Sequence, residues 1–356
     1  MSELGSMMSS SDNIIASTKF SVIEKDGCYA VKSTPLDSVV KPHDPICELD
    51  ILNLLKGKNK HIIEILNSKI VNGIVTMKFP FYEENLYQYM LRNLEKKRWN
   101  PYLLESREAK ETFVNKLDKQ FAVSFFVQLA IALKFIHENG IIHRDVKPQN
   151  VLVSQNFEVT SKARIPQLVL IDFGIAYNVN KPQEPLDFKI TDVSTSIYKA
   201  PELLFSVKNY SFPVDVWALL VLASQMFQSV TQSRTHIPAF ADDGTGEIGE
   251  GSDIRLIASI FRSLGIPRVQ QWPEVQKFGS PAFEGMFGSD GDGKYILDRD
   301  ADQQRTCCLE LFPALESIEE PQKSKLIECF IGMMPFESSK RISSAGIVEL
   351  LQNVAK

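Results

Sequence analysis

Three short segments of the sequence hold the residue types that could carry out group transfer. They are residues 141–150 with Asp145, Lys147 and Asn150, residues 171–174 with Asp172, and residues 200–202 with Glu202. Carboxylates and amides offer oxygen ligands to hard cations such as Mg²⁺, and an ammonium group stabilises charge on phosphate oxygens. Such a set suits phosphoryl transfer, which needs bound metal ions, a positioned hydroxyl and screened phosphates.

In order and spacing, these segments resemble the signature motifs of the protein kinases: His-Arg-Asp-x-Lys-x-x-Asn, Asp-Phe-Gly and Ala-Pro-Glu. Three matched motifs make a chance match negligible, and a lysine two positions after the aspartate is typical of serine/threonine kinases. The resemblance implies that Asp145 accepts the proton of the substrate hydroxyl and that Lys147 neutralises the transferring phosphate of ATP. It also implies that Asn150 and Asp172 hold Mg²⁺. A loop-capping aspartate is the alternative for Asp145, and its neighbours disfavour that interpretation.

A second charged pair lies upstream. Ala30 and Lys32 match the kinase Ala-x-Lys motif, whose ammonium group grips the α- and β-phosphates of ATP. The resemblance implies that Glu48, on a predicted helix, is the partner of Lys32. A solvent-exposed helix glutamate is the alternative for Glu48.

The same resemblance predicts the nucleotide pocket. The residues expected to contact ATP are Ile15, Ala16, Thr18, Ser21, Ile23, Ala30, Lys32, Phe79, Phe81, Tyr82 and Leu152. Phe79 would be the gatekeeper, and backbone groups of Phe81 and Tyr82 would meet the adenine. Leu152 would form an apolar floor beneath the adenine. Ordinary core packing is the alternative for the aromatic residues of this set.

The predicted lid over the phosphates departs from the family. Kinases use a glycine-rich loop here, because a bare backbone can approach the phosphates closely. The three glycine positions fall on Ala16, Thr18 and Ser21. We expect ATP to bind under a stiffer lid, with hydroxyl groups adding phosphate contacts. The alternative is a scaffold that no longer binds nucleotide, and the presence of all five charged or amide site residues argues against it.

The amino-acid composition excludes several classes of protein. The chain has 356 residues, of which 44% are hydrophobic and 23% charged, with a net charge of -5. These values exclude a disordered chain and a strongly basic nucleic-acid-binding protein. The five cysteines show no Cys-x-x-Cys spacing and are expected to be reduced thiols. The longest apolar stretch, near residues 216–227, is too short to span a membrane, so we expect a cytoplasmic or nuclear protein.

The elements that must position these residues fall into two regions. Residues 14–82 are β-rich, with predicted strands at 14–15, 20–23, 28–31, 62–66, 69–71 and 74–79. One helix, residues 46–55, has an apolar stripe of Ile46, Leu49, Leu52 and Leu55. Residues 83–351 are mostly helical, with helices at 86–91, 120–139 and 214–227. Segments 92–119 and 154–166 are predicted to be polar inserts, the second between short strands at 151–153 and 168–171.

The predicted fold is therefore α+β, a bilobal protein kinase domain at residues 14–351 after a flexible tail at residues 1–13. The N-lobe, residues 14–82, is small and β-rich with one main helix, and the C-lobe, residues 83–351, is larger and mostly helical. The resemblance implies two structural contacts in the C-lobe. Glu202 should pair with Arg341, and Asp215 should cap the backbone of the catalytic loop.

The subgroup is also recognisable. Residues 259–267 and 272–275 resemble the insert of the cyclin-dependent kinases. The segment that would meet a cyclin, residues 42–48, keeps only the outline of the corresponding motif and has no arginine. Pro45 is expected to disrupt the first turn of its helix. Ile190 stands where those kinases carry their activating threonine, with Thr191 next to it.

These departures together resemble the cyclin-independent kinases of budding yeasts that activate cyclin-dependent kinases, as do residues 171–175, 194–202 and 285–295. The resemblance implies a monomer that phosphorylates the activation-loop threonine of cyclin-dependent kinases without a cyclin. It also implies that Thr195 contacts Asp145 and Lys147. The alternatives are another kinase of the same group with a different substrate, and a pseudokinase scaffold.

Overall fold

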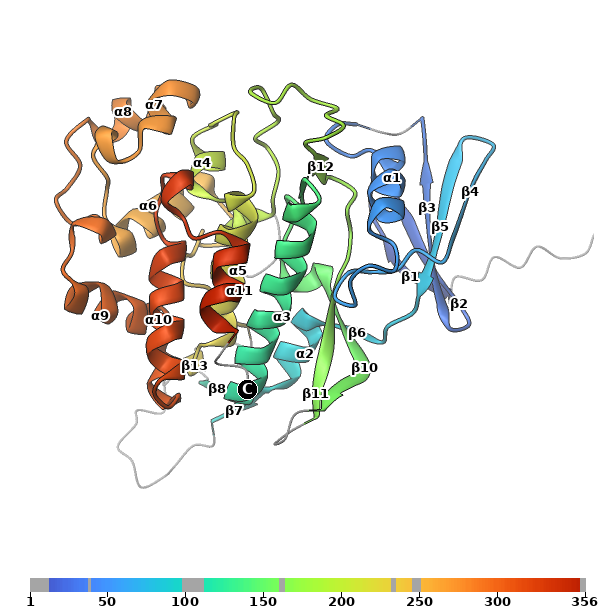
Figure 1. Ribbon diagram of the computed structural model, residues 1–356, viewed down its shortest axis with the longest axis horizontal. Helices are drawn as coiled ribbons and strands as arrows, with labels where there is room; N and C mark the ends of the chain where they lie inside the picture. The colour runs from blue at the N-terminus through green and yellow to red at the C-terminus, as the bar shows by residue number, and fades with distance from the viewer. Residues whose placement is uncertain are drawn as a thin grey trace, which may run out of the picture.

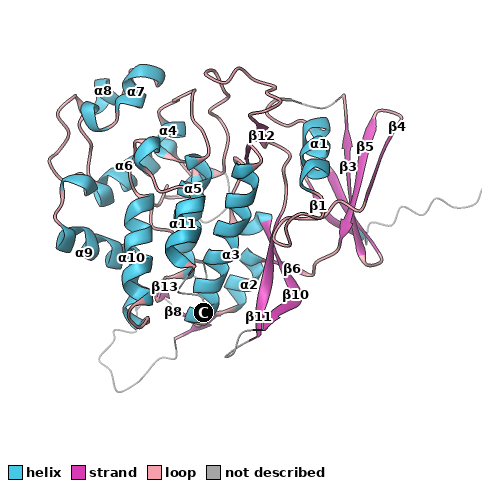
Figure 2. Cartoon of the chain, viewed as in Figure 1, coloured by secondary structure: helices cyan, strands magenta, loops and turns pink. Residues whose placement is uncertain are grey.

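The chain folds into two lobes joined at a single side (Figure 1). The computed structural model describes residues 13–37, 40–97, 112–159, 164–231, 235–244 and 251–352. A β-sheet with one helix forms the smaller lobe, and helices dominate the larger one, as Figure 2 shows by colour. The predicted α+β bilobal architecture is confirmed. Most of the predicted tail lies outside the described residues.

The N-lobe is an antiparallel sheet in the order β1-β2-β3-β5-β4. Its strands are β1 (Ile14–Ser17), β2 (Val22–Asp26), β3 (Tyr29–Pro35), β4 (Asn67–Val71) and β5 (Ile74–Pro80). Tight turns join β2 to β3 and β4 to β5. Gly27 has φ 63° and Gly73 has φ 74°, conformations that glycine adopts without steric cost.

Helix α1 (Pro45–Leu55) crosses beside this sheet and corrects two predictions. Pro45 does not disrupt the helix but begins it, because its missing N–H falls where a helix has no internal acceptor. Asp44 caps the same turn, accepting hydrogen bonds from the N–H groups of Ile46 and Cys47 at 3.0 and 2.9 Å. The buried face also differs from the predicted stripe: Ile46 is exposed, while Cys47 and Ile51 are buried.

The predicted strand at residues 62–66 is wrong. This stretch forms one isolated bridge, between Ile62 and Leu170, and otherwise runs without strand pairing. Its isoleucines are buried in the main core cluster without belonging to a sheet, and the backbone here bonds to Leu170 of the C-lobe. A short apolar run does not distinguish these two environments.

The C-lobe is built around two buried helices, α3 (Lys119–Glu138) and α5 (Pro213–Met226). Every residue of α5 from position 214 to 226 is buried, as its continuous apolar sequence predicts. The other helices surround this pair: α2 (Leu86–Arg92), α4 (Pro201–Leu204), α6 (Asp253–Leu264), α7 (Pro273–Phe278), α8 (Ala282–Phe287), α9 (Ala301–Leu311), α10 (Gln322–Met333) and α11 (Ser344–Leu351). By length and composition alone α3 could cross a membrane, but most of it is buried inside the lobe, as in a core helix.

Short strands set the edges of the cleft. Strand β6 (Glu84–Asn85) pairs with β10 (Val151–Val159), which pairs with β11 (Arg164–Leu170). Strand β9 (Ile141–Ile142) pairs with β12 (Tyr177–Asn178). The loop with Asp145 therefore runs from β9 to β10, and the loop with Asp172 runs from β11 to β12. These two pairings bring the two loops side by side.

Both predicted inserts carry structure that the sequence patterns did not indicate. The described parts of segment 154–166 are not a separate polar insert, because β10 continues to Val159 and pairs there with β11, which begins at Arg164. Within 92–119, β7 (Leu94–Lys96) pairs with β8 (Phe113–Asn115), and β8 also pairs with β13 (Val230–Thr231). Leu94, Phe113 and Leu117 are buried, so the ends of this segment belong to the C-lobe core. Residues 98–111 and 160–163 lie outside the described residues.

The cysteines give a test of this burial. All five are free thiols, and only Cys28 is exposed. Burial raises the pKa of Cys47 to about 12 and also raises the pKa values of Cys307, Cys308 and Cys329. Because the thiolate is the reactive form, we expect Cys28 alone to react quickly with Ellman's reagent at pH 8. The other four should react at least ~100-fold more slowly. A Cys28→Ser variant should lose the fast phase, and a second fast thiol would contradict the fold.

Candidate active site

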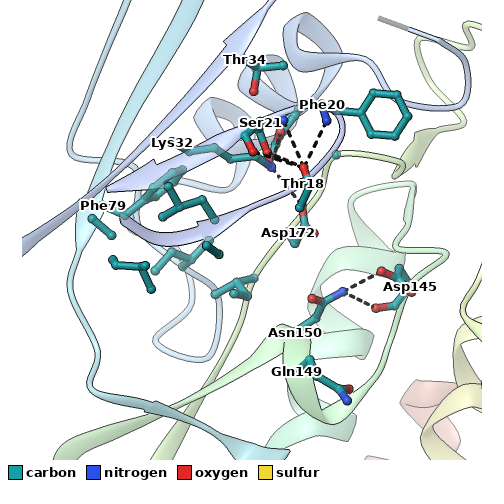
Figure 3. Close-up of a pocket in the computed structure, with 18 of the residues that line it drawn as sticks. Thr18, Phe20, Ser21, Lys32, Thr34, Phe79, Asp145, Gln149, Asn150 and Asp172 are labelled. Carbon is teal, nitrogen blue, oxygen red and sulfur yellow. Dashed lines mark hydrogen bonds and ion pairs between the residues drawn. The ribbon is translucent and has the colours of Figure 1, made fainter. Parts of the chain in front are cut away.

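A cavity of about 670 Å³ opens between the lobes and gathers the predicted site (Figure 3). Every nucleotide-binding, catalytic and metal-binding residue predicted from the sequence lines it. The sheet with its lid contributes one wall, and β10 with the two loops contributes the other. Residues far apart in the chain thus meet in one cleft of the size that small ligands occupy.

Three charged side chains that line this cavity join the two lobes. Lys32 Nζ lies 2.7 and 2.9 Å from the two carboxylate oxygens of Glu48, and 3.0 Å from Asp172 Oδ1. Glu48 is only 3% exposed, whereas Asp172 is 44% exposed and faces the cavity. Glu48 is therefore the buried partner of Lys32, and the solvent-exposed alternative is excluded.

The three groups also set each other's charge. Burial lowers the pKa of Lys32, but the Asp172 and Glu48 carboxylates outweigh it and hold that pKa above its usual range. Lys32 lowers the pKa of Asp172 to about 2, against a smaller effect of burial. Burial raises the pKa of Glu48, and Lys32 partly offsets this. Asp172 is thus ionised at any physiological pH and ready to meet a cation.

The start of α1 fixes Glu48 relative to Asp172. The N–H of Asp44 donates to the carbonyl of Gly174 at 3.1 Å, so the helix cap is tied to the loop that carries Asp172. A Cβ on Gly174 would lie 3.2 Å from Asp172 Oδ1 and 3.6 Å from Lys32 Nζ. A side chain at this position would therefore contact the charged cluster directly and would press on the Asp172 carboxylate.

The catalytic loop holds Asp145 through both carboxylate oxygens. Asn150 Nδ2 donates to Asp145 Oδ2 at 2.8 Å, and Lys147 Nζ lies 2.8 Å from the same oxygen. The Thr195 hydroxyl donates to Asp145 Oδ1 at 2.7 Å and accepts from Lys147 Nζ at 2.7 Å. The predicted contacts of Thr195 are therefore confirmed. They fix the direction of the carboxylate that is predicted to accept a proton from a substrate hydroxyl.

Two buried carboxylates support the loops from below. Asp215, on α5, accepts hydrogen bonds from the N–H groups of His143 and Arg144, both at 2.8 Å. This is the predicted cap, and it holds Arg144 at φ 69°, a conformation that a bulky residue rarely adopts. Glu202 pairs with Arg341 at 2.7 and 3.1 Å with both side chains almost fully buried, as predicted. Removing one partner of such a pair costs about 3–5 kcal/mol.

The passage between the lobes departs from one prediction. The N–H of Phe81 donates to the carbonyl of Cys28 at 3.0 Å, so Phe81 cannot use this group for adenine. That bond makes Pro80 and Tyr29 a non-hydrogen-bonded pair, and the Pro80 carbonyl therefore points away from β3. Pro80, which was not predicted, and Tyr82 become the backbone candidates for adenine. Both line the cavity together with Phe79 and Leu152.

The lid between β1 and β2 is held by one hydroxyl (Figure 3). Thr18 Oγ1 accepts from the N–H groups of Phe20 and Ser21 at 3.2 and 3.0 Å. The Thr18 N–H donates to the Ser21 carbonyl at 2.9 Å. The Thr18 hydroxyl therefore makes hydrogen bonds within the lid, and these contacts take precedence over the expected contact with phosphate. The Thr18 side chain thus orders the lid, whereas glycines at these positions would leave its backbone more flexible.

The tip of the lid touches the segment before α1. The rings of Phe20 and His43 stack with centroids 4.0 Å apart, and both residues line the cavity. Sequence analysis assigned Phe20 to a strand and gave His43 no role, because no motif marks a contact between these segments. Burial lowers the pKa of His43, which favours the neutral ring in this stack.

The donor set at the mouth of the cavity suits Mg²⁺. Asn150 turns its amide nitrogen toward Asp145, which leaves its carbonyl oxygen to serve as a ligand beside the ionised Asp172. In Figure 3, Asp172 lies below the lid and above Asn150. Within the described residues, no group of three or more His, Cys, Asp or Glu side chains could hold a metal by itself. Magnesium fits such a site, because it accepts few protein oxygens and completes its shell with phosphate and water.

Comparisons with known proteins agree with this geometry. The family described as "Protein kinase domain" matches residues 17–349. Serine/threonine-protein kinase CAK1 of Saccharomyces cerevisiae is 42% identical over 95% of this chain and 96% of its own. Serine/threonine-protein kinase csk1 of Schizosaccharomyces pombe is 33% identical over 43% of this chain and 44% of its own.

A solved structure shares the fold at low identity. The structure described as the CAK complex from Chaetomium thermophilum bound to ATP-gamma-S has a TM-score of 0.64 at 18% identity. It covers 96% of this chain and 90% of that one. At this identity the likeness supports the fold alone, whereas the family match and the CAK1 relative extend over nearly the whole sequence. The chain therefore belongs to the protein kinase family and is a serine/threonine protein kinase.

Proposed function

We propose that this kinase transfers the γ-phosphate of Mg-ATP to the activation-loop threonine of cyclin-dependent kinases, as a monomer and without a cyclin. The observation that carries the proposal is the 42% identity to CAK1, which extends over almost the full length of both chains. A kinase of this specificity would meet its substrates in the cytoplasm or the nucleus.

The charges of the cleft support the phosphoryl transfer step. Mg²⁺, when bound, neutralises charge on the phosphate oxygens. Lys32 orients the phosphates from above, held in place by Glu48. Asp145 orients the substrate hydroxyl and takes its proton, while Lys147 lies beside it to stabilise the negative charge of the transferring group. The lid above them excludes water from the reacting oxygens.

The position of α1 supports independence from a cyclin. In this chain α1 is held from inside by the Lys32–Glu48 ion pair, by the bond from Asp44 to Gly174, and by the stack of Phe20 on His43. The charge pair is closed in the isolated chain. A cyclin would therefore not be needed to move α1 inward, because Lys32 and Glu48 are already paired.

The direct test uses an unphosphorylated cyclin-dependent kinase subunit with Mg-ATP and no cyclin. We expect phosphothreonine in its activation loop by mass spectrometry, and none when that threonine is replaced by alanine. An Asp145→Asn enzyme keeps the shape of the site but loses the proton acceptor, so its rate should fall at least ~100-fold. Activity only on other proteins would reject the proposed substrate. Absence of both ATP binding and activity would indicate a scaffold.

Thr195 gives a second test. Thr195→Val removes the hydroxyl that joins Asp145 to Lys147 while keeping the volume of the side chain. Because the two charged groups then lose their fixed direction, kcat should fall on the order of 10- to 100-fold, with the KM for ATP nearly unchanged. Thr195→Ser keeps the hydroxyl and should retain most of the activity. Equal losses in the valine and serine variants, measured by steady-state kinetics, would refute this role.

The lid gives a third test. Thr18→Val leaves the N–H groups of Phe20 and Ser21 without their acceptor, so the lid should lose order. A net loss of about 1 kcal/mol for each of these two hydrogen bonds predicts an ATP affinity about five- to thirtyfold weaker, measured by calorimetry. Thr18→Ser is the matched control and should bind as the original chain does. Tighter binding by the valine variant would show that the freed N–H groups serve phosphate better.

A further inference from the structure

The loop between the Asp-Phe-Gly and Ala-Pro-Glu motifs, residues 172–202, runs between α1 and α4 (Figure 1). We refer to it as the activation segment. At the position that related kinases phosphorylate, this chain has Ile190, whose side chain cannot accept a phosphate. The segment nevertheless delivers Thr195 to Asp145 at 2.7 Å. Something other than a phosphate on residue 190 must hold it.

A carboxylate lies at the centre of this segment. Glu184 Oε1 accepts from Arg144 Nη1 at 2.8 Å, and its Oε2 lies 3.3 Å from Arg144 Nη2. The Arg144 side chain is 1% exposed and the Glu184 side chain 9%, so the pair is shielded from solvent. Bidentate pairs of this kind are the strongest and most directional that arginine makes.

The same carboxylate reaches across the segment to the critical position. The N–H of Ile190 donates to Glu184 Oε2 at 2.6 Å, and the Tyr210 hydroxyl donates to the Ile190 carbonyl at 2.6 Å. The Tyr177 hydroxyl donates to the backbone carbonyl of Glu184 at 2.8 Å. Glu184 is thus fixed at its backbone, and it fixes the main chain of Ile190 in turn.

The surroundings suit one carboxylate better than a phosphate. The Arg144 guanidinium lies 4.6 Å from the Tyr177 ring and 5.3 Å from the Tyr210 ring. The helix α1 contributes Cys47 to this region and no arginine. Lys189, the other buried cation here, directs its ammonium group to the carbonyl of Leu186. Each terminal nitrogen of Arg144 already bonds Glu184, so a phosphate on the neighbouring Thr191 would have to share the guanidinium with that carboxylate.

We propose that Glu184 is a permanent anchor of the activation segment, a side chain that takes the place of an activating phosphate. Arg144 directly precedes Asp145 in the catalytic loop, so the pair couples the segment to the catalytic aspartate. Through Glu184 and Ile190 the same contact sets the path of the chain to Thr195. Glu184 is a positioning residue, since it acts through Arg144 and Ile190 without touching the substrate. The inference rests on the kinase activity and not on the substrate proposed above.

The first arm of the test measures activity without phosphate. The protein is made in bacteria with a co-expressed phosphatase, and mass spectrometry verifies that residues 172–202 carry no phosphate. ATP hydrolysis without a protein substrate is the readout, so a wrong choice of substrate does not affect it. We expect kcat to stay within about twofold of that of protein made in yeast. A need for phosphate on Thr191 or another residue of the segment would overturn the proposal.

The second arm changes the carboxylate. Glu184→Gln keeps the shape but removes the charge, and we expect kcat to fall about tenfold or more, with the KM for ATP within about twofold. Glu184→Asp restores the charge and should recover part of that loss. Asp187→Asn removes an exposed charge of the same segment and should leave activity unchanged. A Glu184→Gln enzyme with unaltered kcat would overturn the proposal.

A structural readout covers the case in which the glutamine variant does not fold or has no measurable hydrolysis. Amide hydrogen exchange is then compared between the original chain and Glu184→Asp. Because the shorter side chain cannot span Arg144 and Ile190 as well, exchange should accelerate at residues 183–195, while α3 and α5 stay protected. Unchanged exchange in that segment would contradict the anchor. Faster exchange across the whole lobe would show a general structural role instead and would likewise overturn it.

Discussion

The Lys32–Glu48–Asp172 cluster is the interaction on which the structure of the cleft depends. It joins β3, α1 and the loop after β11, and so sets the relative position of the lobes at the nucleotide site. Lys32 and Glu48 are largely buried, and a buried charge without its partner costs about 3–5 kcal/mol, so each of these two restricts where the other can lie. The more exposed Asp172 adds a weaker, solvent-screened constraint. Gly174 lies against this cluster, because a Cβ there would be 3.2 Å from Asp172 Oδ1.

In the C-lobe, a buried charged group likewise holds the catalytic loop in place. Its irregular backbone, with Arg144 at positive φ, cannot form the hydrogen bonds of a helix or strand, and the Asp215 carboxylate supplies acceptors in their place. Because α5 is buried on all sides, that carboxylate cannot move without disturbing the core of the C-lobe. The direction of Asp145 is therefore determined by helix packing below it and by Thr195 beside it. The packing of the C-lobe core therefore sets the geometry of the catalytic loop.

A feature of the fold or site could be predicted where its signal lies in a short sequence motif. It could not be predicted where it depends on a contact between segments far apart in the sequence. Motif spacing located Asp145, Lys147, Asn150 and Asp172, because the chemistry demands fixed residue types. Pro45 was misinterpreted although Asp44 before it is a typical helix start, and the apolar run at 62–66 looks the same in a strand as in a lobe contact. The Phe81 bond to Cys28 and the pair of Glu184 with Arg144 were beyond reach, since each joins segments whose proximity only the fold creates.

The three departures of this chain from the pattern of the cyclin-dependent kinases share one physical feature. The lid lacks glycine and is ordered by Thr18, the helix α1 lacks the cyclin motif and is held by Asp44 and Glu48, and the activation segment lacks its threonine. In each place an intramolecular side-chain contact stands where related kinases depend on backbone freedom, a partner or a phosphate. An intramolecular contact has no dissociation constant, so its formation does not depend on the concentration of a partner. The proposed independence from a cyclin and from an activating phosphate rests on these contacts.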